Sequence, residues 1–428
     1  MAASYRRRAM DGPATFSLFV RALPPDRGFL VACGLEDCVR YLEGLAVGDD
    51  DLEAFAAVGL DAATVDSLAG LRFSGEVWAV PEGRIVYADE PLLEVTAPIA
   101  EAQLAETALL NQLTFQTAVA SKAARCRLAA GEAGLVDFAF RRTHGVEAAM
   151  AVARATAIVG FSATSNVAAA QRFGLRASGT MAHSYVEAFT SEVEAFRAFA
   201  TDNPESATLL VDTYDVARGV QAAIEVILEL GLGEQAAIRI DSGDLGTLAV
   251  EARKLLDGAG LTSTRIFASG ALDEFAIAEL CRAGAPIDAF GVGTKMGTSE
   301  DAPSLESVYK LVAYDGRPVM KLSAGKATAP GAKQIFRGPD GDVVGLREEP
   351  TPAGSEPVLE PVMRDGVRLS APEPLERIRS RFDADLVAQP EEARRLRGPI
   401  SRSVHLSTAA TNLAKSVQSH LARRRETV

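Results

Sequence analysis

Three glycine-rich stretches in the middle of the chain could bind an anion: "DSGDLG", "SGALDE" and "GVGTKMG". Glycine in such a turn lets backbone N–H groups approach a ligand closely, and the start of the following helix favours negative charge. One glycine-rich turn alone is usually no more than a turn. Three of them, each after a predicted strand, indicate a pocket for phosphate.

Four aspartates lie close to these glycines. Asp212 and Asp215 follow one predicted strand, and Asp241 and Asp244 follow the next. The simplest interpretation of an aspartate here is a helix N-cap. Four carboxylates beside a phosphate pocket also suit Mg²⁺, which binds a few carboxylates together with the phosphates of a substrate.

Arginines and a histidine add further chemistry. The stretch "FAFRRTHG" places an aromatic strand end beside two arginines, which suits a planar ring that carries a carboxylate. His183, in "SGTMAHSYVEAF", is one of only four histidines in the 428 residues. Taken alone, it is most simply a helix-start residue hydrogen-bonded to backbone. Together these stretches predict a large α/β enzyme that acts on a phosphorylated sugar with Mg²⁺.

Short apolar runs alternate with helical stretches from residue 135 onward, which predicts βαβ units and a parallel sheet. Six strands could form an open doubly wound sheet or close into a barrel. Polar residues follow so many consecutive strands that the top face of a barrel would gather them best, whereas an open sheet has its site at one switch point. The barrel is therefore favoured. The predicted strands are "LVDFAF", "LRASGT", "TLLVDTYD", "AAIRIDSGD", "RIFASG" and "IDAFGVGT".

The two ends of the chain follow a different pattern. "ATFSLFVRAL" and "EVWAVPEGRIVYADEPLLEVTAP" predict strands, and "QLAETALLNQLTFQTAVASKAARCRLAA" predicts a long amphipathic helix. "ESVYKLVAYDGRPVMKLS" predicts a β-hairpin that turns at "YDGRP". We expect residues 1–130 to form the N-terminal part of an α/β domain and residues 131–335 to form the barrel. Residues 336–428, with two amphipathic helices, would pack back on the N-terminal part.

Composition argues against several classes of protein. The net charge of −13 is unsuited to nucleic acid, whose phosphate backbone needs a basic surface. Four scattered cysteines without metal-ligand spacing fit a reduced, cytoplasmic enzyme. No apolar run approaches the ~20 residues of a membrane span. We therefore expect neither a nucleic acid nor a membrane among its partners.

Lysines are unevenly distributed along the chain. Eight can be counted in the printed sequence, and five of them fall between residues 295 and 333. A solvated surface and a cluster of phosphate-binding ammonium groups explain this run about equally well. The five are Lys295, Lys310, Lys321, Lys326 and Lys333.

These motifs, in this order, resemble nicotinate phosphoribosyltransferases over nearly the whole chain. The resemblance is carried by "FRRTHG", "GFSATSN", "SGTMAHSYVEAF", "VDTYD", "RIDSGDL", "SGALDE", "FGVGT" and "VYKLVAYDGRPVMKLSAGKATAPGAKQIFR". It implies formation of nicotinate mononucleotide and pyrophosphate from nicotinate and phosphoribosyl pyrophosphate, coupled to ATP hydrolysis, for NAD salvage. It also implies an irregular, TIM-like α/β barrel, a second α/β domain built from both chain ends, and a homodimer with shared active sites.

The resemblance assigns roles position by position. His183 matches a histidine that ATP phosphorylates transiently. Arg239 and Asp241 match catalytic positions at the phosphoribosyl group and the Mg²⁺ ion. The expected metal ligands are Asp241 and Asp244. The expected substrate-binding residues are Phe138, stacked on the pyridine ring, Arg141, Ser165, Asp212, the 5′-phosphate pocket of Ser269, Gly270, Gly293 and Thr294, and the pyrophosphate or ATP lysines Lys321 and Lys326.

Substrate choice depends on Ser165. Related nicotinamide enzymes carry an aspartate at the matching position, where it accepts from the amide group. A carboxylate there would repel nicotinate, whereas a hydroxyl can donate to it. Nicotinate is therefore expected. The alternatives are a nicotinamide enzyme, a quinolinate enzyme, which would need neither ATP nor the histidine, and a non-catalytic homologue that binds a nucleotide.

The N-terminus departs from the family. Its members begin with a segment like "TDLYELTMA", whose tyrosine stacks on the ring bound in the partner subunit. This sequence begins "MAASY" and matches only from "MA" onward, so Tyr5 does not replace that tyrosine. We expect the true start to lie upstream of Met1.

Overall fold

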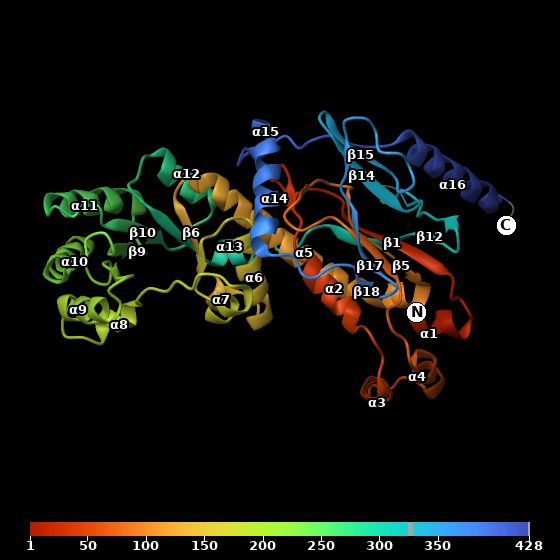
Figure 1. The fold of residues 1–428 in the computed structure, drawn as a ribbon, viewed down its shortest axis with the longest axis horizontal. Helices are drawn as coiled ribbons and strands as arrows, with labels where there is room; N and C mark the ends of the chain where they lie inside the picture. The colour runs from red at the N-terminus through yellow and green to blue at the C-terminus, as the bar shows by residue number, and fades with distance from the viewer. Residues whose placement is uncertain (324–327, 427–428) are drawn as a thin grey trace. The chain divides into compact units, whose positions relative to one another are not determined.

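The chain folds into two compact units, in a computed structural model that describes residues 1–323 and 328–426. Unit 1 comprises Met1–Ala118 and Ser304–Val428, and unit 2 comprises Val119–Pro303. Both termini therefore belong to unit 1 (Figure 1). The boundaries predicted after residues 130 and 335 both lie later in the chain than the limits of the units. The predicted hairpin, residues 306–323, consequently belongs to unit 1.

Unit 1 is built around a seven-stranded sheet whose neighbours all pair antiparallel, in the order β13-β12-β1-β5-β3-β17-β18. The predicted hairpin is confirmed, because Tyr314 pairs with Arg317 across a turn in which Asp315 and Gly316 both have positive φ. The strands are β1 (Pro13–Val20), β3 (Glu76–Ala79), β5 (Pro91–Pro98), β12 (Ser307–Tyr314), β13 (Arg317–Pro318), β17 (Glu360–Arg364) and β18 (Val367–Arg368).

A four-stranded sheet, in the order β16-β14-β15-β19, and the small pair β2-β4 complete the strands of unit 1. The four-stranded sheet lies mostly where the sequence predicted linkers and two helices. Its strands are β14 (Lys333–Gly338), β15 (Gly341–Leu346), β16 (Glu356–Pro357) and β19 (Val404–Leu406), and the pair is β2 (Leu30–Val31) with β4 (Ile85–Val86).

Helices cover these sheets. The predicted long helix is confirmed as α5 (Ile99–Ala130), whose first part belongs to unit 1 and whose last part belongs to unit 2. The other helices of unit 1 are α1 (Ala2–Arg7), α2 (Leu35–Gly44), α3 (Asp49–Ala57), α4 (Ala62–Leu68), α14 (Leu375–Ala388), α15 (Glu391–Arg394) and α16 (Thr408–Glu426).

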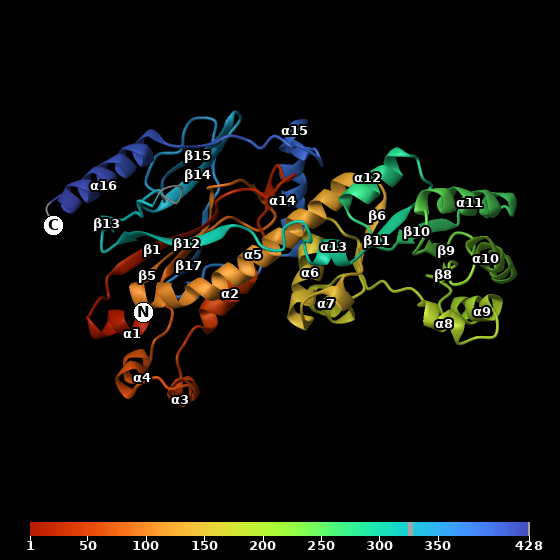
Figure 2. The same ribbon diagram turned by 180° about the vertical axis from the view of Figure 1, so that it is seen from behind.

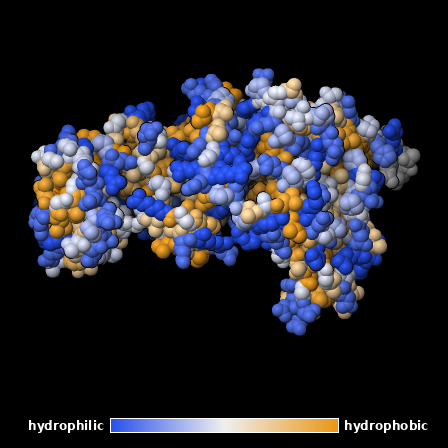
Figure 3. Space-filling view, viewed as in Figure 1, coloured by the Kyte–Doolittle hydropathy of each residue, from blue (hydrophilic) through white to orange (hydrophobic). Residues whose placement is uncertain are grey.

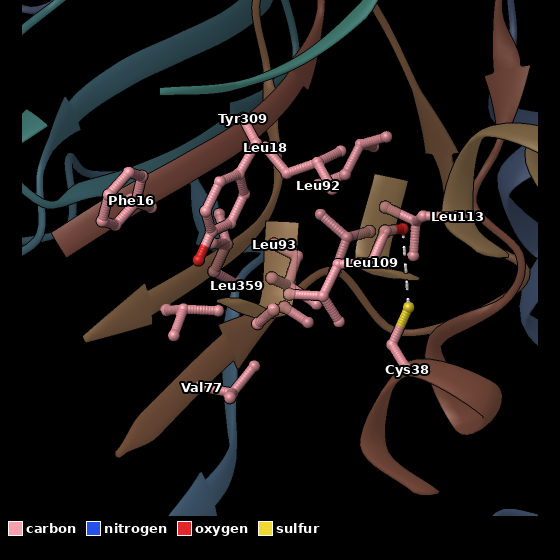
Figure 4. Packing of buried hydrophobic residues seen from close by; sticks show 14 of the residues in the cluster. Phe16, Leu18, Cys38, Val77, Leu92, Leu93, Leu109, Leu113, Tyr309 and Leu359 are labelled. Carbon is pink, nitrogen blue, oxygen red and sulfur yellow. Dashed lines mark hydrogen bonds between the residues drawn. The ribbon is translucent and has the colours of Figure 1, made fainter. Parts of the chain in front are cut away.

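The core of unit 1 joins segments far apart in the sequence. Phe16 of β1 stacks on Tyr309 of β12 with ring centroids 4.7 Å apart. Figure 4 shows these rings beside Leu93 of β5 and Leu109 of α5, all within one buried apolar cluster. The C-terminal strand β17 pairs with β3, so residues near 360 pack on the N-terminal part of the sheet.

Unit 2 contains a six-stranded parallel sheet in the order β7-β6-β11-β10-β9-β8. Its edge strands are β7 and β8, and within the described residues no pairing joins them. The predicted barrel is therefore confirmed only in part, because the parallel sheet forms a half-barrel and no pairing among the described strands closes it. The strands are β6 (Gly134–Asp137), β7 (Ala163–Thr164), β8 (Thr208–Leu210), β9 (Ala237–Ile240), β10 (Arg265–Ser269) and β11 (Ala289–Val292).

One predicted strand is wrong. "LRASGT" forms only a single bridge, between Ala177 and Thr164, and the sixth strand is β7, within "GFSATSN". This short polar stretch has few apolar side chains to bury, so it adds no full strand.

Helices connect the strands of unit 2. Figures 1 and 2 both show α11 and α12 together along one side of the sheet. The helices are a 3₁₀ turn (Phe140–Arg142), α6 (Val146–Ile158), α7 (Val167–Phe173), α8 (His183–Glu187), α9 (Glu192–Asp202), α10 (Val216–Leu230), α11 (Leu245–Gly258), α12 (Glu274–Arg282) and α13 (Thr294–Gly297).

The surface of unit 2 carries some apolar residues, and on the face shown in Figure 3 they gather over α10 and α11. Leu228 of α10 and Val250 of α11 both have exposed side chains. Apolar surface of this extent is common on globular proteins. Among the described residues, no helix has the length and apolar character needed to cross a membrane.

A buried ionic group joins the two larger sheets of unit 1. Glu94 in β5 is inaccessible to solvent, and its Oε1 lies 3.2 Å from Nζ of Lys333 in β14. Arg347 also pairs with Glu94, and its guanidinium lies 4.6 Å from the ring centroid of Trp78. Lys333, part of the predicted lysine cluster, is therefore a buried structural residue here.

We predict that Glu94→Gln lowers the free energy of unfolding by about 3–5 kcal/mol, because it leaves two buried cations without their counter-charge. Trp78 is the only tryptophan of the chain and contacts Arg347, so its fluorescence during urea unfolding reports on the surroundings of the Glu94 ion pairs. Glu76→Gln in β3 is the control, since Glu76 and Arg364 form a half-exposed pair at 3.9 Å worth at most about 1 kcal/mol. Equal midpoints for the two variants would contradict the prediction.

Candidate active site

Arg239 holds together three segments at the carboxyl edge of the parallel sheet. It lies in β9, and its Nε donates to the Ser269 hydroxyl at the end of β10 over 2.7 Å. Its Nη1 donates to Thr180 over 2.6 Å, and its Nη2 donates to Asp241, directly after β9, over 2.7 Å. Ser269 also donates to Asp241. The structure thus brings together three predicted residues, Arg239, Asp241 and Ser269.

Asp212 extends this cluster from the neighbouring strand β8. Its Oδ2 accepts from the Asp241 backbone N–H over 2.9 Å and from the Ser242 hydroxyl over 2.7 Å. Its Oδ1 is buried and has no hydrogen-bond partner among the described residues. An oxygen in this state is costly unless a ligand satisfies it. A cation or a donor group of a ligand would do so.

His183 begins α8 and faces the Asp241 carboxylate. Its Nδ1 lies 3.2 Å from the Thr213 hydroxyl, and its Nε2 lies 3.8 Å from Oδ2 of Asp241. The side chain is 41% exposed, so a solvent-borne ligand can reach it. The simplest interpretation of the sequence assigned His183 a backbone partner, whereas the structure gives it the side-chain hydroxyl of Thr213. Thr213 was not singled out from the sequence. Its place in the quoted motif "VDTYD" was the available signal.

Asp241 is held in its charged form. Burial alone would raise its pKa, but the hydrogen bond from Ser269, the charge of Arg239 beside it and the nearby His183 outweigh burial and lower the pKa below its ordinary value. A carboxylate that stays ionised near neutral pH can bind a cation or orient a hydroxyl group.

Phe138 forms an aromatic surface beside Arg239. Phe138 directly follows β6. Its ring centroid lies 5.4 Å from the Arg239 guanidinium carbon and 5.5 Å from the centroid of the Phe267 ring. Gly291 in the neighbouring strand makes room for it, because a Cβ atom there would lie 2.8 Å from the ring. A planar ligand could stack on this surface.

Asp137, which the sequence analysis missed, fixes the backbone around Phe138. Its carboxylate accepts from the Ala139 N–H over 2.8 Å and from the Thr164 hydroxyl over 2.7 Å. The side chain is buried, which raises its pKa even though these hydrogen bonds act in the opposite direction. Asp137 could have been identified from the sequence, because it is the only charged residue in the apolar strand "LVDFAF".

Gly270 follows Ser269 in a conformation that requires glycine. Its φ is +97°, and a Cβ atom would lie 1.9 Å from the Asp241 carbonyl oxygen. The loop after β10 therefore lies against the backbone that carries Asp241. Gly293 occupies the corresponding place after β11, where a Cβ atom would lie 3.2 Å from the Phe138 carbonyl oxygen.

Two of the four aspartates are helix N-caps, as the simpler interpretation has it. Asp215 caps α10 by accepting from the Arg218 N–H over 2.9 Å. Asp244 caps α11, and both of its carboxylate oxygens accept from Thr247. Among the described residues, no group of three or more His, Cys, Asp or Glu side chains is arranged to hold a metal ion.

Of the remaining predicted residues, Ser165, Thr294 and Arg141 lie in unit 2, and Lys321 lies in unit 1. Ser165 follows β7, half-buried, and its N–H donates to the Asp137 carbonyl over 2.8 Å. Thr294 is exposed at the start of α13, and Arg141 is exposed in the 3₁₀ turn after Phe138. Lys321 is exposed in unit 1, and Lys326 lies outside the described residues.

A cavity of about 720 Å³ lies between α11 and α12 and includes Gly243, Asp244 and Gly270. The other described residues that line it come from the two helices and the loops at their ends, and Arg239, Asp241 and His183 contribute none of its wall. Its volume alone does not make it the reactive site. The converging polar groups around Arg239 are the better candidate.

Comparison with known proteins identifies the family and supports the fold. The family model described as the nicotinate phosphoribosyltransferase (NAPRTase) N-terminal domain matches residues 1–114, and the model of the nicotinate phosphoribosyltransferase (NAPRTase) family matches residues 133–337. The crystal structure of human nicotinic acid phosphoribosyltransferase has a TM-score of 0.86 and 31% identity, covering 97% of this chain and 98% of that one. A nicotinate-nucleotide pyrophosphorylase from Pyrococcus furiosus has a TM-score of 0.76 and 25% identity, covering 90% and 92%.

Curated relatives extend over almost the full length. A nicotinate phosphoribosyltransferase of Mycobacterium tuberculosis, pncB2, is 43% identical over 447 aligned positions, covering 99% of this chain and 96% of the relative. The Homo sapiens nicotinate phosphoribosyltransferase is 34% identical over 510 positions, covering 97% and 94%. With matching family models, full-length identity and the same fold, the chain belongs to the nicotinate phosphoribosyltransferase family.

Proposed function

We propose that the protein is a nicotinate phosphoribosyltransferase of NAD salvage. It forms nicotinate mononucleotide and pyrophosphate from nicotinate and phosphoribosyl pyrophosphate, and ATP hydrolysis through a phosphohistidine is coupled to the reaction. The observation that carries the proposal is the hydrogen-bonded cluster of Arg239, Asp241 and Ser269 with His183 facing it. The 43% identity to a relative of that name supports the same conclusion.

The phosphoribosyl group would bind at the ends of β9, β10 and β11. Backbone N–H groups after Ser269 and Gly293 suit its 5′-phosphate, since both loops contain glycines that let a ligand approach. Asp241, kept ionised by Arg239 and Ser269, can accept from a ribose hydroxyl or bind the metal.

Mg²⁺ fits these carboxylates in part. The buried, unpartnered Oδ1 of Asp212 and the ionised Asp241 would hold it, together with substrate phosphates. Asp244 is less suited than the sequence suggested, because both of its oxygens already cap α11. When bound, Mg²⁺ neutralises negative charge on the departing pyrophosphate.

His183 would carry the phosphoryl group on Nε2. In the tautomer whose Nδ1–H donates a hydrogen bond to the Thr213 hydroxyl, the lone pair of Nε2 is free. Nε2 attacks the γ-phosphorus of ATP, an N–P bond forms, and the bond to the bridging oxygen breaks so that ADP leaves with its electron pair. Water later attacks the phosphorus, which releases inorganic phosphate and restores the imidazole.

Nicotinate would stack on Phe138, with Arg141 and Ser165 near its carboxylate. Lys321 and Lys326 would bind pyrophosphate or ATP phosphates in the full assembly, a cytoplasmic homodimer with shared active sites. The place proposed for nicotinate is supported by the carboxyl edge of the half-barrel, because Phe138, Ser165 and the phosphoribosyl cluster lie at or directly after its strand ends.

We predict that ATP stimulates synthesis of nicotinate mononucleotide by the native chain and that His183→Ala abolishes this stimulation. The variant would retain only the rate measured without ATP, because the phosphoryl acceptor is gone. The measurement is product formation from nicotinate, phosphoribosyl pyrophosphate and Mg²⁺, with and without ATP. His405→Ala, which removes an exposed imidazole in β19 of unit 1, is the control and should keep the stimulation.

Two results would count against the proposal. Turnover of quinolinate without ATP would favour a quinolinate enzyme, and binding of substrates without turnover under any condition would favour a non-catalytic homologue. If ATP still stimulates His183→Ala, the proposed enzyme activity stands and the proposed phosphohistidine is wrong.

We predict that Ser165→Asp raises KM for nicotinate about 100-fold while affecting nicotinamide far less. Two carboxylates at ~5 Å in an environment of effective dielectric ~20 repel by about 3 kcal/mol, which corresponds to this factor. Ser165→Asn is the matched control, because it has the shape of aspartate without the charge. If both variants weaken nicotinate equally, size and not charge determines the choice.

A further inference from the structure

The two glycine loops proposed to bind the 5′-phosphate lie at the ends of neighbouring strands. β10 and β11 pair in parallel, with Ser269 opposite Gly291. One loop runs from Gly270 to Asp273, the N-cap of α12, and the other consists of Gly293 with the first two residues of α13, Thr294 and Lys295. Their backbone N–H groups can contact one phosphate only if the spacing between the loops is fixed.

A charged pair joins these two loops. Nζ of Lys295 lies 2.7 Å from Oδ2 of Asp273. The other oxygen of Asp273, Oδ1, caps α12 by accepting from the N–H groups of Phe275 and Ala276 over 3.1 and 2.9 Å. One carboxylate therefore both starts the helix after the first loop and binds the second loop.

The next residue anchors the same point to α5. Glu274 is inaccessible to solvent, and its two oxygens lie 2.7 Å from Nζ of Lys122 and 2.8 Å from Nε of Arg125. Lys122 also lies 2.9 Å from Asp301, which follows α13. The start of α12 is thus held by buried ion pairs on one side, while Asp273 extends toward Lys295 on the other.

The first loop needs such support because its backbone is not relaxed. Gly270 and Ala271 both have positive φ, +97° and +48°, and the second of these is disfavoured for a residue with a Cβ atom. A strained conformation persists only where the surrounding structure imposes it. The capping oxygen of Asp273 and the Glu274 ion pairs supply that constraint.

We propose that Asp273 and Lys295 are positioning residues that hold the two phosphate loops at a fixed spacing, without touching the substrate. This inference rests on the proposed function of the loops. It separates Lys295 from the phosphate-binding role that its place in the lysine cluster suggested, since its ammonium group is already engaged by Asp273.

The test is a double-mutant cycle on phosphoribosyl pyrophosphate binding. Asp273→Asn keeps the helix cap, because asparagine caps as well as aspartate, and Lys295→Met keeps most of the side-chain volume. We expect each variant to weaken Kd and raise KM about tenfold, with kcat changed less than twofold, and the double variant to be no weaker than either one. Lys295→Arg should recover most of the loss.

The opposite pattern identifies direct binding. If Lys295 contacts phosphate, Asp273→Asn frees it and tightens binding, which overturns the proposal, as does unchanged binding in both single variants. Glu229→Gln is the matched control, because it breaks an exposed ion pair of the same unit, Arg197 with Glu229 at 2.7 Å, away from these loops. It should leave Kd and KM unchanged.

Hydrogen exchange gives a readout that does not depend on activity. Backbone amides of residues 270–272 and 293–294 should exchange faster in Asp273→Asn and Lys295→Met than in the native chain or in Glu229→Gln. Unchanged exchange overturns the proposal. If the native chain fails to bind phosphoribosyl pyrophosphate, the proposed function fails, and faster exchange at both loops still supports the positioning role.

Discussion

The arrangement of the site depends on one side chain, the guanidinium of Arg239. It donates to Thr180, Asp241 and Ser269, which belong to three separate segments of unit 2. Because guanidinium is planar and always charged, its donors fix directions as well as distances. The position of Asp241 then determines what His183 faces. A lysine here would provide charge without this geometry, so the strand ends would no longer be held in one arrangement.

Close backbone approach is the second constraint on the site. Gly270 lies against the Asp241 carbonyl, and Gly291 makes room for the Phe138 ring. Neither glycine has a reactive side chain, yet each allows the side chain of another residue to take its position. The structure therefore uses glycine in two ways, as a conformation that other residues avoid and as the absence of a side chain at a point of contact.

The sequence predicted much of this arrangement because parallel strands place their carboxyl ends together. Asp241 and Ser269 could be grouped on that ground alone, whereas Arg239 was assigned only by the family resemblance. It could not predict Thr213 or Asp137, since their roles depend on which neighbour each side chain meets. The short strand β7 was missed for a related reason, because two residues carry no period. The barrel was favoured because polar residues follow many consecutive strands, yet the described sheet has β7 and β8 as edges.

Charge was the least reliable guide. The lysine run between residues 295 and 333 suggested either a solvated surface or a phosphate-binding cluster, but Lys333 pairs with buried Glu94 and Lys295 pairs with Asp273. A sequence records where cations occur and not which anion each one meets. Burial decides between these cases, because a cation removed from water requires a partner within the fold. An exposed lysine such as Lys321 remains available to a ligand, whereas a buried one is already committed to the structure.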